Sequence, residues 1–275
     1  MTILSDEPRG GYTVIYLPGA LRQRKPKGEP GPSVVSTIAR TPIGPFHWHV
    51  HERNGSVTLQ HDQVTLPLPD RAAAGRALAD ALEAQYGNAD ALVLALPRGG
   101  VPVAHQVAER LGAELDVMLV RKLGAPSQPE LAAGAIASGG IRVLNPDVIA
   151  GLGVSESALD AIAARETREL ERRERLYRGD RARPQIAGRC VILIDDGVAT
   201  GATMRAAIAA LRQQQPERVV VAVPVAAADT LMRLRGEADD VVCLASPSPF
   251  WSIGQWYRDF TQVSDDEVRR LLSRH

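Results

Sequence analysis

The sequence has few aromatic residues, only two cysteines and no net charge, and these shortages exclude several classes of protein. Its 275 residues carry 32 basic and 32 acidic side chains, so overall charge does not attract it to nucleic acids or anionic membranes. The longest apolar runs are about five to seven residues, whereas a membrane-spanning helix needs about 20. The first thirty residues lack the sustained apolar core of a secretory signal. We therefore expect a cytoplasmic protein without a membrane or nucleic-acid partner.

Cysteine and lysine are both scarce. Cys190 and Cys243 each lie in or beside an apolar, strand-like run, so we predict two small buried thiols and neither a disulfide nor a metal site. Lysine occurs only at positions 25, 27 and 122, which makes Lys122 the only lysine after position 27.

The character of the chain changes near residue 66. Many prolines and glycines interrupt residues 1–66, where we expect only short strands, two of them forming a β-hairpin around the turn Asn54-Gly55. From 67 to 275, helical and strand patterns alternate, which is typical of a parallel sheet with crossover helices. We therefore predict a loop-rich N-terminal extension of residues 1–66 and a main α/β domain of residues 67–275.

The main domain is a regular succession of predicted elements. Helices are expected after the N-cap Asp70 as far as residue 86, from the loop at 97–100 to residue 111, at 155–178 and at 204–213. Strands are expected at 91–96, 114–120, 191–194, 218–223 and 240–245, with a hairpin of 132–137 and 141–144. Short strands buried on both faces predict a doubly wound, five-stranded parallel sheet.

The strongest functional signal is the segment 191–203, in which an apolar strand runs into Asp195 and Asp196 and then into a loop that opens a helix. The loop comprises Gly197, Val198, Ala199, Thr200, Gly201, Ala202 and Thr203. Its backbone N–H groups and the helix N-terminus can hold a phosphate monoester. The carboxylates would repel a phosphate, so we expect both in solvent-reachable positions, binding the hydroxyls of an attached ribose or metal-bound water. The alternative is a strand-to-helix turn with acidic N-caps.

A glycine-rich loop and a basic pair follow two other predicted strands. Arg98, Gly99 and Gly100 come after the first strand of the sheet, where paired glycines can present backbone N–H groups to an anion. Arg121 and Lys122 end the second strand, where two cations can neutralise the charge of a leaving group. Taken singly, the segments are also compatible with a tight turn and with two solvated basic residues. Their order along the chain favours one shared anion site.

The segment 191–203 resembles the phosphoribosyl pyrophosphate loop of the type I phosphoribosyltransferases. Further segments, at 70–75, 96–104, 120–134 and 256–260, resemble a bacterial subfamily of phosphoribosyltransferase-domain proteins whose substrates are largely unassigned. The resemblance covers about residues 67–275. It implies that residues 98–100 form the pyrophosphate loop, with a strained peptide at Arg98-Gly99. It also implies that Arg121 and Lys122 match an Arg-Lys pair of adenine phosphoribosyltransferases, which stands before a mobile loop.

The resemblance implies a reaction and a role in nucleotide metabolism. Ribose 5-phosphate would pass from phosphoribosyl pyrophosphate to a nitrogenous base or related acceptor, with inversion and with release of pyrophosphate. Mg²⁺ would bind substrate phosphates, and Asp195 and Asp196 would reach it through water or substrate. Arg98, Arg121 and Lys122 would neutralise the departing pyrophosphate. A homodimer is also expected.

One position departs from a known pattern of this family. Purine-salvage enzymes that act on hypoxanthine and guanine carry an aspartate base within the phosphate loop, where this sequence has Ala199. A base would have to come from elsewhere, with Glu130 or a carboxylate of the helix at 155–178 as candidates.

That helix is rich in both charges. Glu171 with Arg175, and Glu174 with Arg178, have a stabilising spacing of four residues. The pattern predicts a solvated, ion-paired face. The alternative is that the helix forms part of a lid over the site.

Aromatic residues are concentrated near the C-terminus. Five of the eleven lie between positions 250 and 260, namely Phe250, Trp251, Trp256, Tyr257 and Phe260. Such a cluster can stack against a planar base, so the first four are predicted to contact the acceptor. Ordinary packing of a C-terminal arm is the alternative.

Histidines alternate along one predicted strand. His47, His49 and His51 share one strand face, with His61 as a neighbour across the hairpin. Zinc or another divalent metal could be held there, although a polar strand face also explains the pattern.

The extension suggests two readings besides a simple enzyme. The chain could be a non-catalytic sensor that binds phosphoribosyl pyrophosphate or a nucleotide and regulates a partner through residues 1–66. It could also be a metal-binding module fused to an enzyme.

Overall fold

The structure, a computed structural model, describes residues 64–87, 89–126 and 128–274, together with the backbone of six strands that precede them. For Pro129 and Glu130 it likewise describes the backbone alone. The six strands are β1 (Thr2–Leu4), β2 (Val14–Tyr16), β3 (Ala20–Leu21), β4 (Val34–Thr41), β5 (Gly44–Arg53) and β6 (Ser56–His61). The predicted turn Asn54-Gly55 lies outside the described residues.

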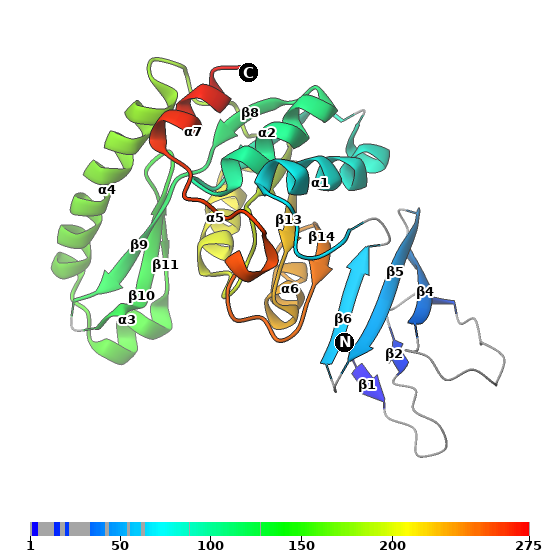
Figure 1. Cartoon of the computed structure of the whole chain (residues 1–275). Coiled ribbons are helices and arrows are strands. Elements are labelled where there is room, and N and C mark those ends of the chain that lie inside the picture. The colour runs from blue at the N-terminus through cyan, green and yellow to red at the C-terminus, as the bar shows by residue number, and fades with distance from the viewer. Residues whose placement is uncertain are drawn as a thin grey trace, which may run out of the picture.

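Five parallel strands form the centre of the molecule (Figure 1). They are β7 (Ala91–Ala95), β8 (Glu114–Val117), β12 (Cys190–Ile194), β13 (Arg218–Val225) and β14 (Asp240–Ser246). Their order in the sheet is β14-β13-β12-β7-β8, and each neighbouring pair is parallel. The predicted doubly wound parallel sheet is confirmed, and the direction of strand succession reverses between β12 and β7.

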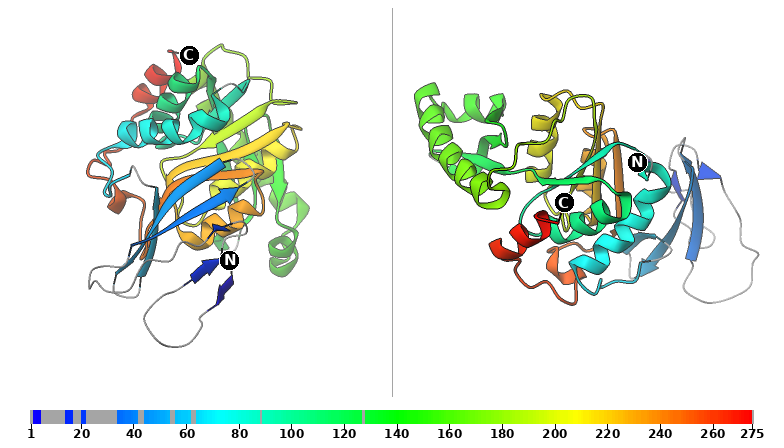
Figure 2. Two further views of the ribbon diagram at one scale, coloured as in Figure 1. Left: turned by 90° about the vertical axis from the view of Figure 1, so that its right-hand side faces the viewer. Right: turned by 90° about the horizontal axis from the view of Figure 1, so that it is seen from above.

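Helices cover both faces of this sheet (Figure 2). On one face lie α1 (Arg71–Tyr86), α2 (Gly100–Leu111) and α7 (Asp265–Leu272), and on the other α5 (Ala202–Arg212) and α6 (Ala228–Arg235). Alternate residues of β12 serve the two cores: Ile192 and Ile194 pack with the first group, and Val191 and Leu193 with the second. Burial on both faces is why this strand is apolar throughout.

Capping residues set the helix ends as predicted. The Asp70 carboxylate accepts a hydrogen bond from the backbone N–H of Ala73, and α1 ends at Gly87. Ser155 caps α4 (Glu156–Arg178) in the same way, and Gly179 ends it. The short helices α3 (Pro146–Leu152), α6 and α7 were not predicted, because seven or eight residues give too few turns for a clear apolar period.

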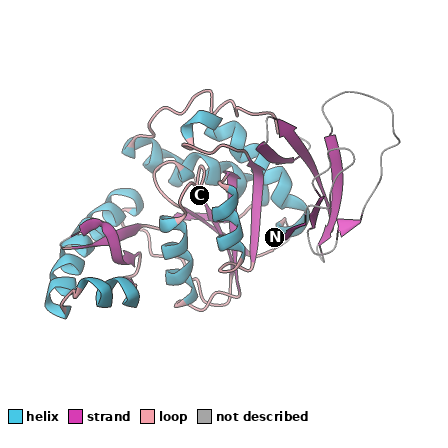
Figure 3. Ribbon diagram, turned by 90° about the horizontal axis from the view of Figure 1, so that it is seen from below, coloured by secondary structure: helices cyan, strands magenta, loops and turns pink. Residues whose placement is uncertain are grey.

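An antiparallel sheet interrupts the connection from β8 to β12. Its strands are β9 (Val120–Ala125), β10 (Gln128–Ala137) and β11 (Ile141–Leu144), in the order β11-β10-β9. Together with α3 and α4 they form an arm that projects from the central sheet (Figures 1 and 3). The predicted hairpin of β10 and β11 is confirmed.

The predicted extent of the second strand is wrong. The chain leaves the central sheet after Val117, and Arg121 and Lys122 lie within β9, paired with β10, instead of ending β8. The residues at the break, Met118 and Leu119, are as apolar as their neighbours. The hydrophobic pattern therefore carries no signal of the change of sheet.

The N-terminal strands continue the central sheet beyond β14. β6 pairs antiparallel with the end of β14 at Ala245 and Ser246. Outward from β14, the strand order is β6-β5-β4-β3. β5 and β6 pair as the predicted hairpin. Their register pairs His61 with Trp48 and with none of the three histidines of β5, so the expectation that His61 neighbours them across the hairpin is wrong. The side chains of His47, His49 and His51 lie outside the described part of the chain.

The two cysteines are free, as predicted. Cys243 is buried, and burial raises the pKa of its thiol to about 12. Cys190 is partly buried, which raises its thiol pKa as well. Within the described ranges, no helix is long and apolar enough to cross a membrane.

Candidate functional site

The loops that follow β12 and β7 meet where the strand order reverses. Ile194 is level with Ala95 in the parallel ladder, and the backbone N–H of Leu96 donates to the Ile194 carbonyl at 2.8 Å. Open α/β sheets bind ligands in the crevice at such a reversal, at the carboxyl ends of the strands. The structure thus places the predicted phosphate loop, at 197–203, beside the predicted glycine loop, at 98–100.

Gly99 and Gly100 pack directly against the two carboxylates. A Cβ atom at Gly99 would lie 2.0 Å from Oδ2 of Asp196. A Cβ atom at Gly100 would lie 2.7 Å from the Ile194 carbonyl oxygen and 2.9 Å from the Cα atom of Asp195. Glycine is needed at both positions because no side chain fits between the loops.

The unusual peptide bond of the glycine loop is one position earlier than predicted. The cis peptide joins Pro97 to Arg98, whereas we expected a strained peptide at Arg98-Gly99. Gly99, the N-cap of α2, has right-handed helical backbone angles, with φ of −60° and ψ of −35°.

Asp196 is buried against Arg71, the first residue of α1. The Arg71 Nε atom donates to Oδ2 of Asp196 at 2.7 Å, and its Nη1 atom donates to the carbonyl of Thr261 at 2.8 Å. The same guanidinium lies 3.9 Å from the centre of the Phe260 ring. The expectation that both carboxylates are solvent-reachable is therefore wrong for Asp196, which is 7% exposed.

Asp195 has a different environment. Its Oδ1 atom accepts a hydrogen bond from the backbone N–H of Asp196 at 2.9 Å, and the residue as a whole is partly exposed. Loss of hydration and the adjacent charge of Asp196 raise the pKa of Asp195 well above its usual range. Burial also raises the pKa of Asp196, but the Arg71 guanidinium opposes that rise. Asp195 is thus the acid whose charge a bound hydroxyl or cation would stabilise.

The phosphate loop keeps free backbone donors. The Val198 N–H donates to the Val225 carbonyl at 2.9 Å, which fixes the start of the loop beside β13. Among the described residues, no acceptor receives the N–H groups of Ala199, Thr200 or Gly201. The next N–H groups belong to the first turn of α5, which has no acceptors within the helix. Free amides beside a helix N-terminus suit an anion.

Gly201 allows the loop to turn into α5. Its φ of +76° is in the left-handed region, and a Cβ atom there would lie 2.6 Å from Cγ2 of Thr230. The Thr230 hydroxyl donates to the Ala199 carbonyl at 2.5 Å, so α6 supports the loop from outside.

Arg121 lines a small cleft beside the two loops. The empty volume of the cleft is about 320 Å³, counting the part open to solvent. Its lining residues come from the segment just before the glycine loop, the residues after β8, and β9, α4 and α5: Leu96, Pro97, Met118, Leu119, Val120, Arg121, Leu170, Arg173 and Thr203. Lys122 is not among them, because it alternates with Arg121 along β9 and is exposed. The structure thus separates the predicted basic pair.

Arg98 lies at another edge of the glycine loop. Its Nη1 atom is 3.7 Å from Oδ1 of Asp265, the first residue of α7. The Tyr177 hydroxyl also donates to Oδ1 of Asp265 at 2.6 Å, and burial together with this bond raises the pKa of Tyr177 to about 12. The Arg98 side chain is thus held beside α7 and does not line the cleft.

The aromatic residues of the C-terminal arm do not share one role. Tyr257 is buried, and its hydroxyl donates to the backbone carbonyl of Asp196 at 2.6 Å. Trp251 is 81% exposed, whereas the rings of Phe250 and Trp256 pack with their centres 6.2 Å apart. Tyr257 therefore supports the acid pair from within the core.

The arm also lies over the start of the phosphate loop. A Cβ atom at Gly197 would lie 2.6 Å from Cγ2 of Ile253. The segment predicted to contact the acceptor is thus next to the site, although its buried tyrosine packs as a core residue.

A carboxylate of α4 was a candidate for a general base, and Glu166 and Glu169 are two that lie beside arginines lining the cleft. For Glu166, partial burial raises the pKa, but hydrogen bonds from Arg121 and Arg165 outweigh it and lower the pKa below the usual range. Hydrogen bonds from Arg172 and Arg173 lower the pKa of Glu169 to about 2. Both are therefore poor proton acceptors. The Glu130 side chain lies outside the described residues.

The pattern of the sequence did not identify Arg71 and Arg173 as site residues. Arg71 contacts Asp196 across 125 positions of sequence, and the local pattern shows only that it follows an N-cap. Arg173 belongs to a helix so rich in charge that one arginine has no distinguishing signal. In the residues that the structure describes, no group of three or more His, Cys, Asp or Glu could hold a metal ion.

Similar proteins are known. Residues 66–260 match the family model described as "Phosphoribosyl transferase domain". Two Mycobacterium tuberculosis proteins, from strains CDC 1551 / Oshkosh and ATCC 25618 / H37Rv, are each 51% identical to this chain over 205 residues. Their names describe them provisionally as phosphoribosyl transferases. The match covers 74% of this chain and 46% of each relative, so the chain spans less than half the length of those relatives.

A solved structure supports the same likeness. The crystal structure of TT1426 from Thermus thermophilus is 46% identical in sequence and has a TM-score of 0.67. The match covers 74% of this chain and 97% of that chain.

Proposed function

Since the chain belongs to the phosphoribosyl transferase domain family, we propose that it transfers ribose 5-phosphate from phosphoribosyl pyrophosphate to a nitrogen atom of a base or related acceptor. The observation that carries the proposal is the contact of the two loops at the strand-order reversal, where Gly99 and Gly100 pack on Asp196 and Asp195. The substrate has a phosphate at one end, a ribose in the middle and a pyrophosphate at the other end. In this proposal the phosphate loop holds the phosphate, Asp195 the ribose and the glycine loop the pyrophosphate.

The phosphate loop and Asp195 would hold the part of the substrate that is transferred. The free N–H groups of Ala199, Thr200 and Gly201 would donate to the 5′-phosphate, with the hydroxyls of Thr200 and Thr203 beside them. Asp195 would accept hydrogen bonds from the ribose hydroxyls, and Asp196 would keep Asp195 in place through its backbone N–H. These contacts fix the ribose relative to the leaving group.

The glycine loop and Arg121 would hold the pyrophosphate. As the bond from ribose carbon 1 to the pyrophosphate oxygen breaks, negative charge grows on pyrophosphate, and the guanidinium of Arg121 stabilises it. The new bond joins carbon 1 to the acceptor nitrogen on the opposite face of the ribose, with inversion, and the proton that this nitrogen loses would pass to solvent.

The residues of this site fit a magnesium ion that is bound mainly by the substrate phosphates. Asp195 is a partly exposed residue, whereas Oδ2 of Asp196 accepts a hydrogen bond from Arg71. Mg²⁺ usually keeps several waters and binds through one or two carboxylates plus substrate phosphates. We therefore propose that Asp195 contacts Mg²⁺ through water, and that the charge of Mg²⁺ helps neutralise pyrophosphate.

Pyrophosphate release tests the proposal. The full chain is mixed with Mg²⁺, phosphoribosyl pyrophosphate and one base at a time from a panel of purines and pyrimidines. Release that depends on one base supports the transfer. Tight binding of phosphoribosyl pyrophosphate with no release for any base would overturn it and would support the sensor interpretation. The D195N variant serves as the inactive control.

A further inference from the structure

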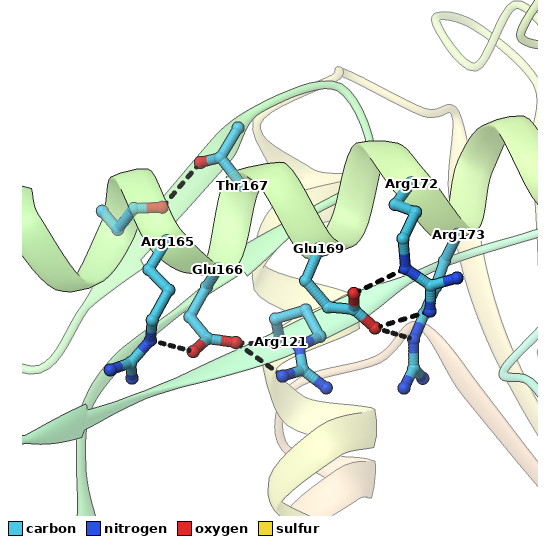
Figure 4. A network of polar contacts seen from close by, with 8 residues as sticks. Arg121, Arg165, Glu166, Thr167, Glu169, Arg172 and Arg173 are labelled. Atoms are coloured by element: carbon cyan, nitrogen blue, oxygen red, sulfur yellow. Dashed lines mark hydrogen bonds and ion pairs between the residues drawn. The ribbon is translucent and has the colours of Figure 1, made fainter.

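Two arginines beside the cleft are held by two carboxylates of one helix. Arg121 donates from Nε and Nη2 to Oε2 of Glu166, at 2.9 and 2.6 Å. Arg173 donates from Nε to Oε1 of Glu169 at 2.7 Å. Figure 4 shows that Glu166 and Glu169 extend from successive turns of α4 toward the side where Arg121 lies.

Both arginines line the cleft, and no acidic residue does. The other seven lining residues are apolar or neutral, including Pro97, which directly precedes the glycine loop, and Thr203 at the start of α5. A cleft lined by two guanidinium groups and by no carboxylate of the described residues favours an anion with several oxygen atoms, because each guanidinium can donate two parallel hydrogen bonds.

Arg173 keeps most of its donors for a ligand. Glu169 receives only its Nε–H, and no acceptor in the described part of the chain receives a hydrogen bond from its Nη1 or Nη2 atom. The side chain is 37% exposed, so these atoms are reachable from the solvent. The bond to Glu169 restricts the side chain before a ligand arrives, which reduces the entropy lost on binding.

The neighbouring Arg172 also binds Glu169 but lies away from the cleft. It donates from both Nε and Nη2 to Glu169, at 2.8 and 3.1 Å, and its side chain is 58% exposed. It does not line the cleft. The two arginines thus share a helix and a carboxylate but differ in their access to the site.

We propose that Arg173 is a further pyrophosphate-binding residue, which acts with Arg121 on the leaving group of the substrate. This inference rests on the proposed function, because it assigns pyrophosphate to the cleft beside the glycine loop. It adds to the site a residue from the projecting arm that neither phosphate-binding loop supplies. α4 thereby becomes one wall of the pyrophosphate site.

Binding of inorganic pyrophosphate in the presence of Mg²⁺ tests the inference. Titration calorimetry compares the full chain with the variants R173Q and R172Q. Loss of charge-assisted hydrogen bonds should weaken pyrophosphate binding about 10- to 100-fold in R173Q. R172Q should bind within about twofold of the wild type. Ribose 5-phosphate, which lacks the pyrophosphate group, should bind R173Q as tightly as it binds the wild type.

Three results would overturn the inference: no binding of pyrophosphate to the wild type, equal pyrophosphate affinity of R173Q and R172Q, or an equal loss of ribose 5-phosphate binding in R173Q. If R173Q fails to fold, R173K keeps the charge without the planar fork, and it should still bind pyrophosphate more weakly than R172K. Transfer activity is measured separately. Selective loss of pyrophosphate binding in a protein that transfers to no base would overturn the proposed function alone.

Discussion

The Arg71 guanidinium binds Oδ2 of Asp196 at 2.7 Å, with the two side chains only 11% and 9% exposed. The pair joins the first turn of α1 to the loop after β12, and Phe260 and Thr261 add the C-terminal arm through the same guanidinium. Asp196 therefore serves as a structural anchor, which leaves Asp195 as the acid available to a ligand. The two adjacent acids therefore have different expected roles, Asp196 in stability and Asp195 in activity.

The first prediction separates the two acids. D196N should lower the free energy of unfolding by about 3 kcal/mol, because it leaves a buried guanidinium without its partner charge. In D195N the free energy of unfolding should change by less than in D196N, but base-dependent pyrophosphate release should be lost. Urea denaturation and the release assay measure the two properties. Equal losses of stability in the two variants would contradict the different roles of Asp195 and Asp196.

The second prediction concerns pH. Burial and the charge of Asp196 raise the pKa of Asp195, so protonation of this acid favours the folded state. Its contribution is fully present below the usual aspartate pKa of about 4 and is lost as the pH rises through the raised pKa. The stability of the wild type relative to D195N should therefore fall as the pH rises from about 4 toward neutrality. Thermal unfolding of both proteins across this range measures the difference, and a constant difference would contradict the prediction.

The sequence predicted the elements whose patterns are long and regular. The capped helices α1 and α4, the apolar strand β12 and the hairpin of β10 and β11 all carry strong local signals. The order of the loops after β7 and β12 predicted that they meet, which the structure confirms, whereas phosphate binding there stays a prediction. The exchange of sheets after Val117 was not predictable, since an uninterrupted apolar run fits either sheet.

The contacts between distant residues could not be predicted from the sequence. The pattern of α4 predicted a solvated ion-paired face. Glu174 and Arg178 do form an ion pair, but both side chains are buried, so the prediction of a solvated pair is wrong here. The same helix also places Arg173 beside the cleft, because α4 packs on β9. Periodicity gives the face of a helix but not the element that covers it.

The third prediction concerns the close approach of the two loops. G99A would place a methyl group 2.0 Å from the Asp196 carboxylate, so it should destabilise the protein by about 2 kcal/mol and lower activity. G151A is the matched control, because a Cβ atom in this α3 position has nothing within 4 Å. It should be neutral or stabilising by up to about 1 kcal/mol, as alanine favours helices. A well-folded, fully active G99A variant would show that the loops do not need this approach.

The last prediction tests whether the C-terminal arm supports catalysis through Tyr257. Y257F removes the hydroxyl that donates to the Asp196 carbonyl at 2.6 Å, and it leaves that buried carbonyl without this donor. The free energy of unfolding should fall by about 1 kcal/mol. Pyrophosphate release should fall several-fold, because the backbone that carries both acids loses a support.

The matched control is Y86F. Tyr86 is also buried, and its hydroxyl donates to Oδ2 of Asp240 at 2.7 Å, at the first residue of β14 and at the opposite end of the sheet from the two loops. Y86F should lose a similar amount of stability, about 1 to 2 kcal/mol, with pyrophosphate release unchanged once the protein is folded. Both variants remove the hydroxyl of a buried tyrosine, at different ends of the sheet. Y86F also removes the hydrogen bond that this hydroxyl accepts from Nε2 of Gln85 at 2.7 Å, so its loss of stability should be at least that of Y257F. If both variants lose activity in proportion to stability, Tyr257 contributes to folding alone, and the arm has no specific influence on the acid pair.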